Sequence, residues 1–256
     1  MYFHRAIVRT PSQSIAKGLT SSAELGVVDY SNACQQHHNY VDALKCCGLE
    51  VTTLGALDDF PDACFVEDPA VLTPEFALCT RPGAPSRMDE VAFIEPLLAE
   101  LYPQNLHHIQ SPGFLDGGDV LQIERHFYIG LSARTNLAGA EQLIAILKQY
   151  DYQASIVSFE NMLHLKTGVS YIANQTLLIQ HHLVDCPTFN EFHKIIVEPE
   201  ESYAANSIMI NDKMLMPAGF PRTIKAVEQA GYAVIPVDLS EFRKIDGGLS
   251  CLSLRF

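Results

Sequence analysis

The sequence lacks the features that mark several classes of protein. It has no apolar run of about 18 residues, which argues against a membrane-spanning helix, and residues 1–5 read as the start of a strand, not as a signal or transit peptide. Basic residues are scarce, because 17 Lys and Arg stand against 30 Asp and Glu, for a net charge of -13. This charge argues against nucleic acid and anionic membranes as partners. We therefore expect a cytoplasmic protein, whose charge is compatible with a small cationic substrate.

The cysteines form no metal-binding or disulfide pattern. There are seven, an odd number, and they include no CxxC pair. Zinc-site spacings are absent, and a disulfide framework is not expected in so long a cytosolic chain. The histidines include three adjacent pairs, whose members point in different directions and rarely chelate one metal. We predict no structural metal site and expect most thiols to act as small buried apolar groups.

A unit of strand, turn, strand, helix and strand recurs along the chain. One copy has strands at 119–123 and 126–129, a helix at 138–150 and a strand at 153–158. A second copy has strands at 70–73 and 76–80, a helix at 88–101 and a strand at 106–109. A third has strands at 207–210 and 214–216, a helix at 223–231 and a strand at 232–237. The least regular copy has segments at 169–173, 176–180 and 189–197, and its helix is expected to be short or missing.

The N-terminal copy is incomplete. Its strand at 3–9, helix at 33–47 and strand at 49–54 lack one hairpin strand, which the tail at 249–254 can supply. Five units in 256 residues give a period of roughly 50, which is typical of repeat architectures. A closed ring fits better than a doubly wound sheet, which needs helices and not hairpins between successive strands. We predict one domain, 1–256, with an α/β fold: a five-bladed propeller of ββαβ-type repeats.

Polar residues gather just ahead of the first strand of each unit. Corresponding segments of a ring should converge at one end, so we expect these side chains to lie together. Each alone has an ordinary interpretation, such as a turn, a core histidine or a buried C-terminal thiol. The segments contain Glu67 and Asp68, then Asp116 to Asp119, then His164, then 201–206, and finally Cys251.

Such a group would be a Cys/His site with an acidic wall. Cysteine attacks as a thiolate, and nearby carboxylates raise the pKa of a thiol, so they do not help it to ionise. Carboxylates do bind cations, and the planar donors of a guanidinium match them well. A papain-like protease would instead need donors for an oxyanion. The charges therefore predict a cationic, planar electrophile as substrate.

Six motifs carry a resemblance to a known family. Together they resemble dimethylarginine dimethylaminohydrolase, of the pentein or guanidino-group-modifying superfamily, nearly end to end. The family fold is a five-bladed α/β propeller, in agreement with the repeats. The motifs lie at 18–22, 65–69, 115–121, 132–136, 163–168 and 245–251.

The resemblance implies hydrolysis of Nω-methylated arginine to citrulline and a methylamine, without metal or organic cofactor. Cys251 would be the nucleophile, His164 the general acid and then base, and Asp116 a further catalytic residue that holds the guanidinium together with Asp68. Related proteins carry Glu where this chain has Asp116, which reaches one methylene less. Loop 10–32 would be a lid. The amino-acid end of the substrate would meet Leu19, Asp62, Glu67, Arg87, Arg134 and the carbonyl of Ile245.

Other functions of the same fold remain alternatives. An arginine deiminase would release ammonia, but such relatives tend to carry an added helical region. An agmatine deiminase would not need two carboxylate-binding arginines, and amidino transferases carry more chain. A non-catalytic binding module is also an alternative, against which the intact Cys251, His164 and Asp116 speak. The family alone suggests a weak homodimer, and reversible Zn²⁺ binding to Cys251 and His164 is a further hypothesis.

Overall fold

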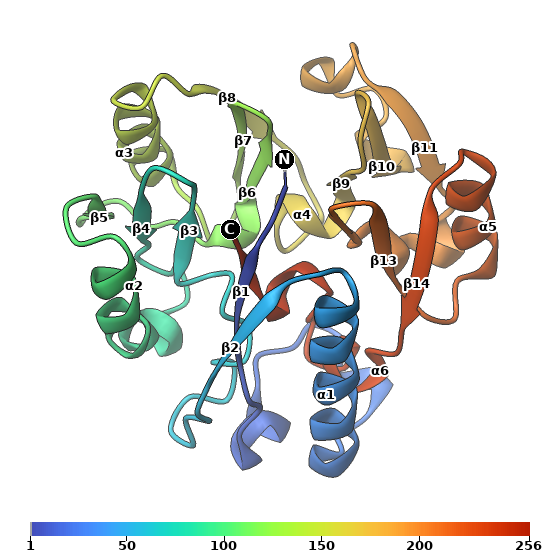
Figure 1. The fold of residues 1–256 in the computed structure, drawn as a ribbon, viewed down its shortest axis with the longest axis horizontal. Coiled ribbons are helices and arrows are strands. Elements are labelled where there is room, and N and C mark those ends of the chain that lie inside the picture. Colours follow the sequence, from blue (N-terminus) through green and yellow to red (C-terminus); the bar gives the residue numbers. More distant parts are fainter. Residues whose placement is uncertain (1) are drawn as a thin grey trace. The chain divides into compact units, whose positions relative to one another are not determined.

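The computed structural model describes residues 2–256 and contains five three-stranded sheets of one topology (Figure 1). In each sheet the central strand pairs with one neighbour antiparallel and with the other parallel. The antiparallel pair is a hairpin in four sheets, and the parallel strand follows a connection that is helical in most of them. This order confirms the predicted ββαβ-type repeats and excludes a doubly wound sheet.

The described chain forms two compact units. The first takes in Gly168–Arg255 and the described part of Met1–Val66, and the second takes in Glu67–Thr167 with Phe256. Among residues 2–256, no helix is both long and apolar enough to cross a membrane.

The second unit holds two sheets and the helices that connect their strands. Its main hydrophobic cluster joins Leu78 of one sheet, and Phe76 just before that strand, to Phe127 of the other sheet and to Leu143 of α3. The strands are β3 (Ala70–Leu72), β4 (Ala77–Cys79), β5 (Leu106–His108), β6 (Val120–Ile123), β7 (His126–Leu131) and β8 (Gln153–Ser158). The helices are α2 (Glu95–Leu101), α3 (Leu137–Lys148), α4 (Leu165–Gly168), which ends at the first residue of the other unit, and the 3₁₀ helices η3 (Pro85–Phe93) and η4 (Gly117–Asp119).

The single helix expected at 88–101 was wrong. It is divided into η3 and α2 at Ile94, which caps both. Pro96 explains the break, because proline has no N–H for a helical hydrogen bond and is favoured only in a first turn. The chain therefore starts a new helix there.

The first unit holds three sheets. Their strands are β1 (Arg5–Arg9), β2 (Glu50–Leu54) and β15 (Leu254–Arg255); β9 (Val169–Tyr171), β10 (Thr176–Gln180) and β11 (His193–Val197); and β12 (Ile208–Ile210), β13 (Lys213–Pro217) and β14 (Ala233–Val237). The α-helices of this unit are α1 (Tyr30–Cys46), α5 (Pro221–Gln229) and α6 (Ser240–Arg243), and the 3₁₀ helices are η1 (Gln13–Lys17), η2 (Ala23–Leu25), η5 (His181–Leu183), η6 (Pro187–Phe189), η7 (Pro199–Ala205) and η8 (Ser250–Leu252). The short or missing helix expected between β10 and β11 is confirmed as η5 and η6.

Helix α1 begins three residues before the expected position. The side chain of Asp29 accepts a hydrogen bond from the Asn32 N–H at 2.9 Å, which satisfies a donor of the first turn. The helix ends at Cys46, before Gly48 with its positive φ of 89°. An Asp cap therefore sets the start that the apolar pattern alone placed too late.

The two ends of the chain share one sheet, as predicted. Strand β15 pairs antiparallel with β1, with Ile7 opposite Leu254. The strand is shorter than the 249–254 expected, because Ser250–Leu252 forms the 3₁₀ turn η8. Cys251 thus lies in a turn ahead of the strand and not within it.

Candidate active site

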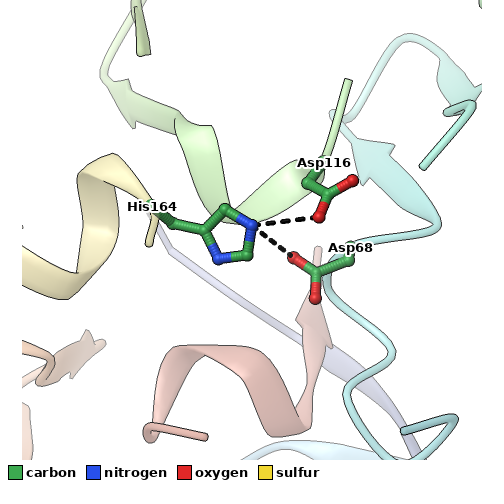
Figure 2. A group of neighbouring side chains, drawn as sticks. All are labelled: Asp68, Asp116 and His164. Carbon is green, nitrogen blue, oxygen red and sulfur yellow. Dashed lines mark hydrogen bonds and ion pairs between the residues drawn. The ribbon is translucent and has the colours of Figure 1, made fainter. Parts of the chain in front are cut away.

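His164 lies against two buried carboxylates in the second unit (Figure 2). Its Nε2 is 3.0 Å from Oδ2 of Asp116 and 3.9 Å from Oδ1 of Asp68. All three residues are buried, and Asp116 has no exposed surface at all. The shorter reach of Asp116 is therefore sufficient for a hydrogen bond to the imidazole. Its other oxygen, Oδ1, accepts the Gly83 N–H at 2.8 Å.

Gly118 allows this close approach. A Cβ on Gly118 would lie 2.7 Å from Nδ1 of His164 and 2.9 Å from Oδ1 of Asp68. Real Cβ atoms are not found at such distances from ring or carboxylate atoms, so any larger residue would displace the imidazole. The Gly118 N–H in turn donates to Oδ1 of Asp68 at 3.1 Å. The Gly-Gly turn after Asp116 is thus part of the packing around His164.

Asp68 also belongs to a buried ion network with Arg87 and Glu90. Nη1 of Arg87 donates to Oδ2 of Asp68, and Nη2 of Arg87 donates to Oε2 of Glu90 at 2.7 Å. The Arg87 Nε also donates to Glu90, at 3.0 Å to Oε1. All three groups are buried, and the two carboxylates raise the pKa of Arg87 well above its usual value against the effect of burial. Asp68 is therefore fixed in place and keeps a positive counter-charge.

These charges set the protonation of His164. Burial alone would lower its pKa, but the charge of Asp68 and the hydrogen bond to Asp116 outweigh burial. The charge of Asp119 acts in the same direction, and the pKa of His164 rises to about 9. Burial would raise the pKa of Asp68, but the charges of His164 and Arg87 lower it. The site therefore holds an imidazolium beside a carboxylate at neutral pH.

The same three residues offer donor atoms within 4.8 Å of one another, as a metal site would. A metal ion needs a neutral imidazole, whereas Asp68 and Asp116 favour the imidazolium. Arg87 also occupies one side of Asp68. We therefore assign no metal to this group.

Glu67 and Arg134, two further predicted site residues, also lie in the second unit. Oε1 of the buried Glu67 accepts from Nζ of Lys166 at 2.6 Å. Arg134 is half-buried, and its backbone N–H donates to Oγ of Ser132 at 2.9 Å. Its guanidinium has no ion-pair partner within residues 2–256. Arg134 is therefore open to an anionic ligand, while Arg87 already holds carboxylates.

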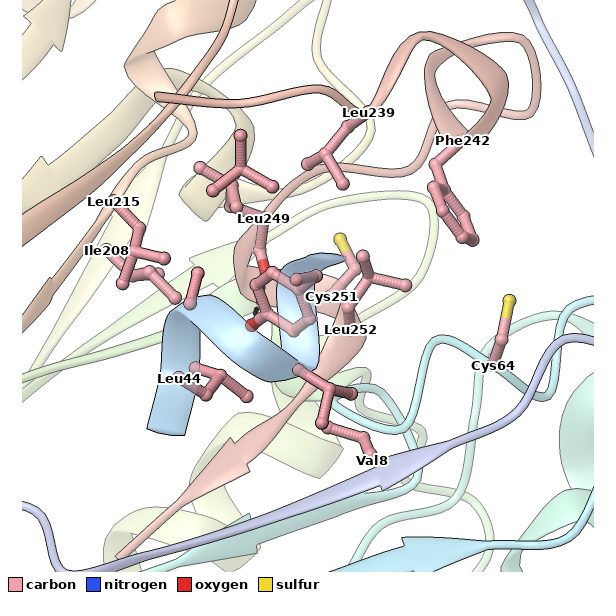
Figure 3. Close-up of a cluster of buried hydrophobic side chains, with 14 of the residues drawn as sticks. Val8, Leu44, Cys64, Ile208, Leu215, Leu239, Phe242, Leu249, Cys251 and Leu252 are labelled. Atoms are coloured by element: carbon pink, nitrogen blue, oxygen red, sulfur yellow. Dashed lines mark hydrogen bonds between the residues drawn. The ribbon is translucent and has the colours of Figure 1, made fainter. Parts of the chain in front are cut away.

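Cys251 lies in the first unit, in the turn η8 and within the largest hydrophobic cluster of that unit (Figure 3). Its exposed fraction is 9%. The turn is held by paired hydrogen bonds: the Ser250 N–H donates to Oδ1 of Asn206 at 2.9 Å, and Nδ2 of Asn206 donates to Oγ of Ser250 at 3.2 Å. The Tyr40 hydroxyl donates to the carbonyl of Leu249 at 3.0 Å. The backbone just before Cys251 is thus held by Asn206 and Tyr40.

The glycines before Cys251 are required by packing. A Cβ on Gly247 would lie 2.3 Å from the ring of Phe65, and one on Gly248 would lie 2.5 Å from Cγ of Asn206. No other residue type fits without moving these groups. The Gly-Gly pair therefore lets the tail pass close to its neighbours before it reaches the cysteine.

Leu19, Asp62 and Ile245 come together in the first unit. Oδ1 of Asp62 accepts the Leu19 N–H at 3.0 Å. Gly18 lies between them, since a Cβ there would be 3.0 Å from Oδ1 of Asp62 and 3.3 Å from Cδ1 of Ile245. The side chain of Leu19 is exposed, whereas Asp62 and Ile245 are buried. Three residues that lie far apart in the sequence thus form one group.

Comparison with known proteins identifies the family. The sequence profile of eukaryotic N,N dimethylarginine dimethylhydrolase matches residues 19–198. The N(G),N(G)-dimethylarginine dimethylaminohydrolase of Pseudomonas aeruginosa is 48% identical over 254 residues, which cover 99% of this chain and 100% of the relative. The chain belongs to the dimethylarginine dimethylaminohydrolase family.

Solved structures of dimethylarginine dimethylaminohydrolase have the same fold. A cysteine-to-serine variant of the Pseudomonas aeruginosa enzyme complexed with citrulline matches with a TM-score of 0.98 and 47% identity, over 100% of both chains. A histidine-to-glycine variant as its adduct with S-methyl-L-thiocitrulline matches with a TM-score of 0.97 and 47% identity, over 99% of this chain and 100% of the other. The five sheets are thus those of a pentein.

A more distant structure shows the fold alone. The N-terminal domain of ArgZ, an arginine dihydrolase from cyanobacteria, matches with a TM-score of 0.85 at 20% identity, over 98% of this chain and 96% of that one.

The predicted site residues of this family member divide between the two units. The second unit brings together Asp68, Asp116, His164 and Arg87, and it also contains Glu67 and Arg134. The first unit brings together Leu19, Asp62 and Ile245, and it contains Cys251 in the turn η8. Each of the five polar segments predicted to converge lies just before the strand that pairs antiparallel with the central strand of its sheet. These strands are β3, β6, β9, β12 and β15.

Two buried carboxylates were missed by the sequence analysis. Glu90 holds Arg87 from three residues along the chain, a spacing that could have indicated the pair. Asp119 was noted only as one flank of the Gly-Gly turn, and nothing in the sequence indicates its contacts. Glu90 thus acts on Arg87 through a local contact, and Asp119 acts on the backbone next to His164 through a tertiary one.

Proposed function

We propose that this chain hydrolyses Nω-methylated L-arginine to L-citrulline and a methylamine. The name of its Pseudomonas aeruginosa relative gives dimethylarginine as the substrate of that protein, and a variant of that enzyme was solved with citrulline. The observation that carries the proposal is the buried group of His164, Asp68 and Asp116, in a chain that is 48% identical to that relative along 99% of its length. Two carboxylates beside an imidazolium suit a cationic guanidinium substrate.

In the proposed reaction, the Cys251 thiol loses its proton to solvent when the cationic substrate binds, and the thiolate attacks the guanidinium carbon to form a tetrahedral adduct. His164 donates its proton to the leaving nitrogen, the C–N bond breaks, and methylamine or dimethylamine departs. A thiouronium joined to Cys251 remains. The pKa of His164, near 9, supports this step, because the imidazole carries its proton at neutral pH before the substrate reacts.

The second half of the reaction uses the neutral imidazole. His164 takes a proton from water, and the resulting hydroxide adds to the thiouronium carbon. The C–S bond then breaks to give the Cys251 thiolate and the protonated ureido group of citrulline, which loses its proton to solvent. Asp68 and Asp116 would hold the planar group throughout. The α-ammonium and α-carboxylate would meet Leu19, Asp62, Glu67, Arg87, Arg134 and the Ile245 carbonyl. Of the two arginines, Arg134 has the freer guanidinium, and Arg87 also holds Asp68.

This proposal requires residues 1–256 to act as one catalytic domain, since Cys251 and His164 come from different units. A cytoplasmic location, a weak homodimer, the absence of nucleic-acid, membrane and cofactor partners, and Zn²⁺ inhibition stay predictions.

A panel of substrates tests the proposal. The purified chain is incubated with dimethylarginine, monomethylarginine, arginine and agmatine, and citrulline or its decarboxylated analogue is measured by a ureido colour reaction. We expect product from the two methylated arginines. Product from arginine alone would instead indicate a deiminase, and product from none of the four would favour a binding module.

His164→Gly separates the two chemical steps. We expect this variant to retain alkylation of the Cys251 thiol by iodoacetamide but to release no citrulline, because both proton transfers need the imidazole. Mass spectrometry of the labelled tail peptide and the citrulline assay measure the two properties. Wild-type turnover in the variant would remove His164 from the mechanism.

A further inference from the structure

Asp119 is a third buried carboxylate near His164, and the reaction as written does not use it. It ends the short helix η4, three residues after Asp116, and has no exposed surface. Its backbone N–H donates to the carbonyl of Asp116 at 3.0 Å. Asp119 is thus fixed to the residue that hydrogen-bonds the imidazole.

The two carboxylate oxygens of Asp119 hold two other segments. Oδ1 accepts the N–H of Leu165, the residue next to His164, at 2.9 Å. Oδ2 accepts the Ser132 hydroxyl at 2.6 Å. The same Ser132 oxygen accepts the Arg134 N–H. One carboxylate therefore connects the backbone that carries the imidazole to the turn that carries Arg134.

The turn is also tied to Asp116. Oγ1 of Thr135 accepts the Asp116 N–H at 3.1 Å. The backbones of Ser132 and Thr135 pair with each other across the turn. A displacement of Asp119 would therefore be felt by Asp116, Arg134 and His164 together.

We propose that Asp119 is a positioning residue, which fixes His164 relative to Arg134 and adds its negative charge to the environment of the imidazole. The proposal rests on the proposed function, in which His164 transfers the protons and Arg134 binds the α-carboxylate. Asp119 does not touch the reacting atoms in this account. It acts through Leu165 on one side and through Ser132 on the other.

The charge of Asp119 adds to that of its neighbours. The charged groups that face His164 in the second unit are Asp68, Asp116 and Asp119, and Arg87 lies beyond Asp68. Burial raises the pKa of Asp119, while the charge of His164 and the hydrogen bonds from Ser132, Thr135 and Leu165 oppose that rise. Those donors favour the ionised form, which in turn favours the imidazolium.

Asp119→Asn separates charge from hydrogen bonding. Its amide oxygen can still accept the Leu165 N–H, and its NH₂ group can donate to the Ser132 oxygen. We expect a fall in kcat of about tenfold or more, with little change in KM. The alkaline limb of the kcat profile should move to lower pH, because His164 loses one negative neighbour and gives up its proton sooner.

Asp119→Ala removes the hydrogen bonds as well. We expect kcat to fall by about 100-fold, since small displacements of a catalytic group have effects of this size. KM should rise too, because the Arg134 turn loses its support. Wild-type kcat and an unmoved pH profile in the Asn variant would overturn the proposal, even if the Ala variant failed to fold.

Glu201→Gln is the matched control. Glu201 is a buried carboxylate of the first unit whose Oε2 accepts the N–H and the hydroxyl of Thr223 at 2.7 and 2.6 Å, at the start of α5. Kinetics are compared per folded molecule, as judged by circular dichroism. An equal loss of kcat in Glu201→Gln and Asp119→Asn would show that Asp119 acts through stability alone and would overturn the proposal.

A second readout does not depend on turnover. The pKa of His164 is measured by NMR of the labelled imidazole in the wild type and in Asp119→Asn. We expect a lower pKa in the variant. An unchanged pKa would overturn the proposal. If the wild-type protein yields no citrulline but the pKa of His164 is lower in Asp119→Asn than in the wild type, the result counts against the proposed function alone.

Discussion

At the scale of single residues, the absence of a side chain at Gly118 has the most direct effect on His164. We predict that Gly118→Ala lowers kcat by about 100-fold, because its Cβ would lie 2.7 Å from Nδ1 of His164 and must push the ring aside. Citrulline kinetics measure the loss. Gly55→Ala is the control, since a Cβ there meets no atom within 4 Å. Equal activity in both variants would contradict the packing argument.

The residues themselves differed in how far the sequence revealed them. Cys251, His164 and Asp116 stand in motifs at corresponding points of the repeat, so pattern and resemblance both indicated them. Asp119 acts through a contact to Leu165 that only the folded chain creates. Glu90 pairs with Arg87 at a spacing of three residues, which the sequence could have indicated, whereas the ion pair between Arg87 and Asp68 could not be predicted from it.

At the scale of elements, Asp246 ties the loop that carries Leu19 to the tail that carries Cys251. Its Oδ2 accepts the Ser21 N–H at 2.5 Å, and its Oδ1 accepts the Ser22 hydroxyl at 2.8 Å. Asp246 has a positive φ of 58°, which suits Asp better than most residues. The predicted lid is therefore hydrogen-bonded to the segment that precedes Cys251.

We predict that Asp246→Gly removes these hydrogen bonds to Ser21 and Ser22 without backbone strain, because glycine accepts the same φ. Hydrogen exchange at 19–22 should become faster, and the KM for the methylated arginine should rise. Asn174→Gly is the control, since Asn174 also has a positive φ but sits in the turn between β9 and β10. Unchanged exchange at 19–22 in Asp246→Gly would show that the loop does not depend on this contact.

Element types were predictable from the sequence wherever the pattern was local. The strands β8 and β10 lie where alternation and turn residues placed them, since both signals are carried by adjacent residues. The tail was read as one strand because its residues are apolar. It contains the turn η8 because Asn206 and Tyr40, both distant in sequence, bind its backbone. The pattern within the tail cannot show these partners.

At the scale of the whole molecule, acid and alkali should weaken different units. His37 of α1 is buried, and its Nε2 has no hydrogen-bond partner in the described chain. Burial, with the charge of His38, lowers the pKa of His37 to about 4. The unfolded chain, with a His pKa near 6.5, therefore binds the proton first. Stability of the first unit should be lost as the pH falls from about 6.5 towards 4.

The contribution of His164 to stability depends on pH in the opposite direction. Its folded pKa, about 9, is above the unfolded value, so its contribution is complete below pH 6.5 and is lost as the pH rises through 9. Hydrogen exchange against pH should therefore show opening of the first unit in acid and of the second in alkali. His37→Asn, which has no imidazole to protonate, should reduce only the acid effect. Uniform opening of both units at both extremes would contradict these assignments.

The central claim is that Cys251 is the nucleophile, and two buried thiols of one hydrophobic cluster test it. Cys251 and Cys64 both lie in that cluster, so Cys251→Ser and Cys64→Ser make similar changes to the core (Figure 3). The measurement is citrulline formed from dimethylarginine by the wild type and the two variants, with folding checked by circular dichroism. We predict no turnover in Cys251→Ser and nearly full turnover in Cys64→Ser. Equal activity of the two folded variants would contradict the account.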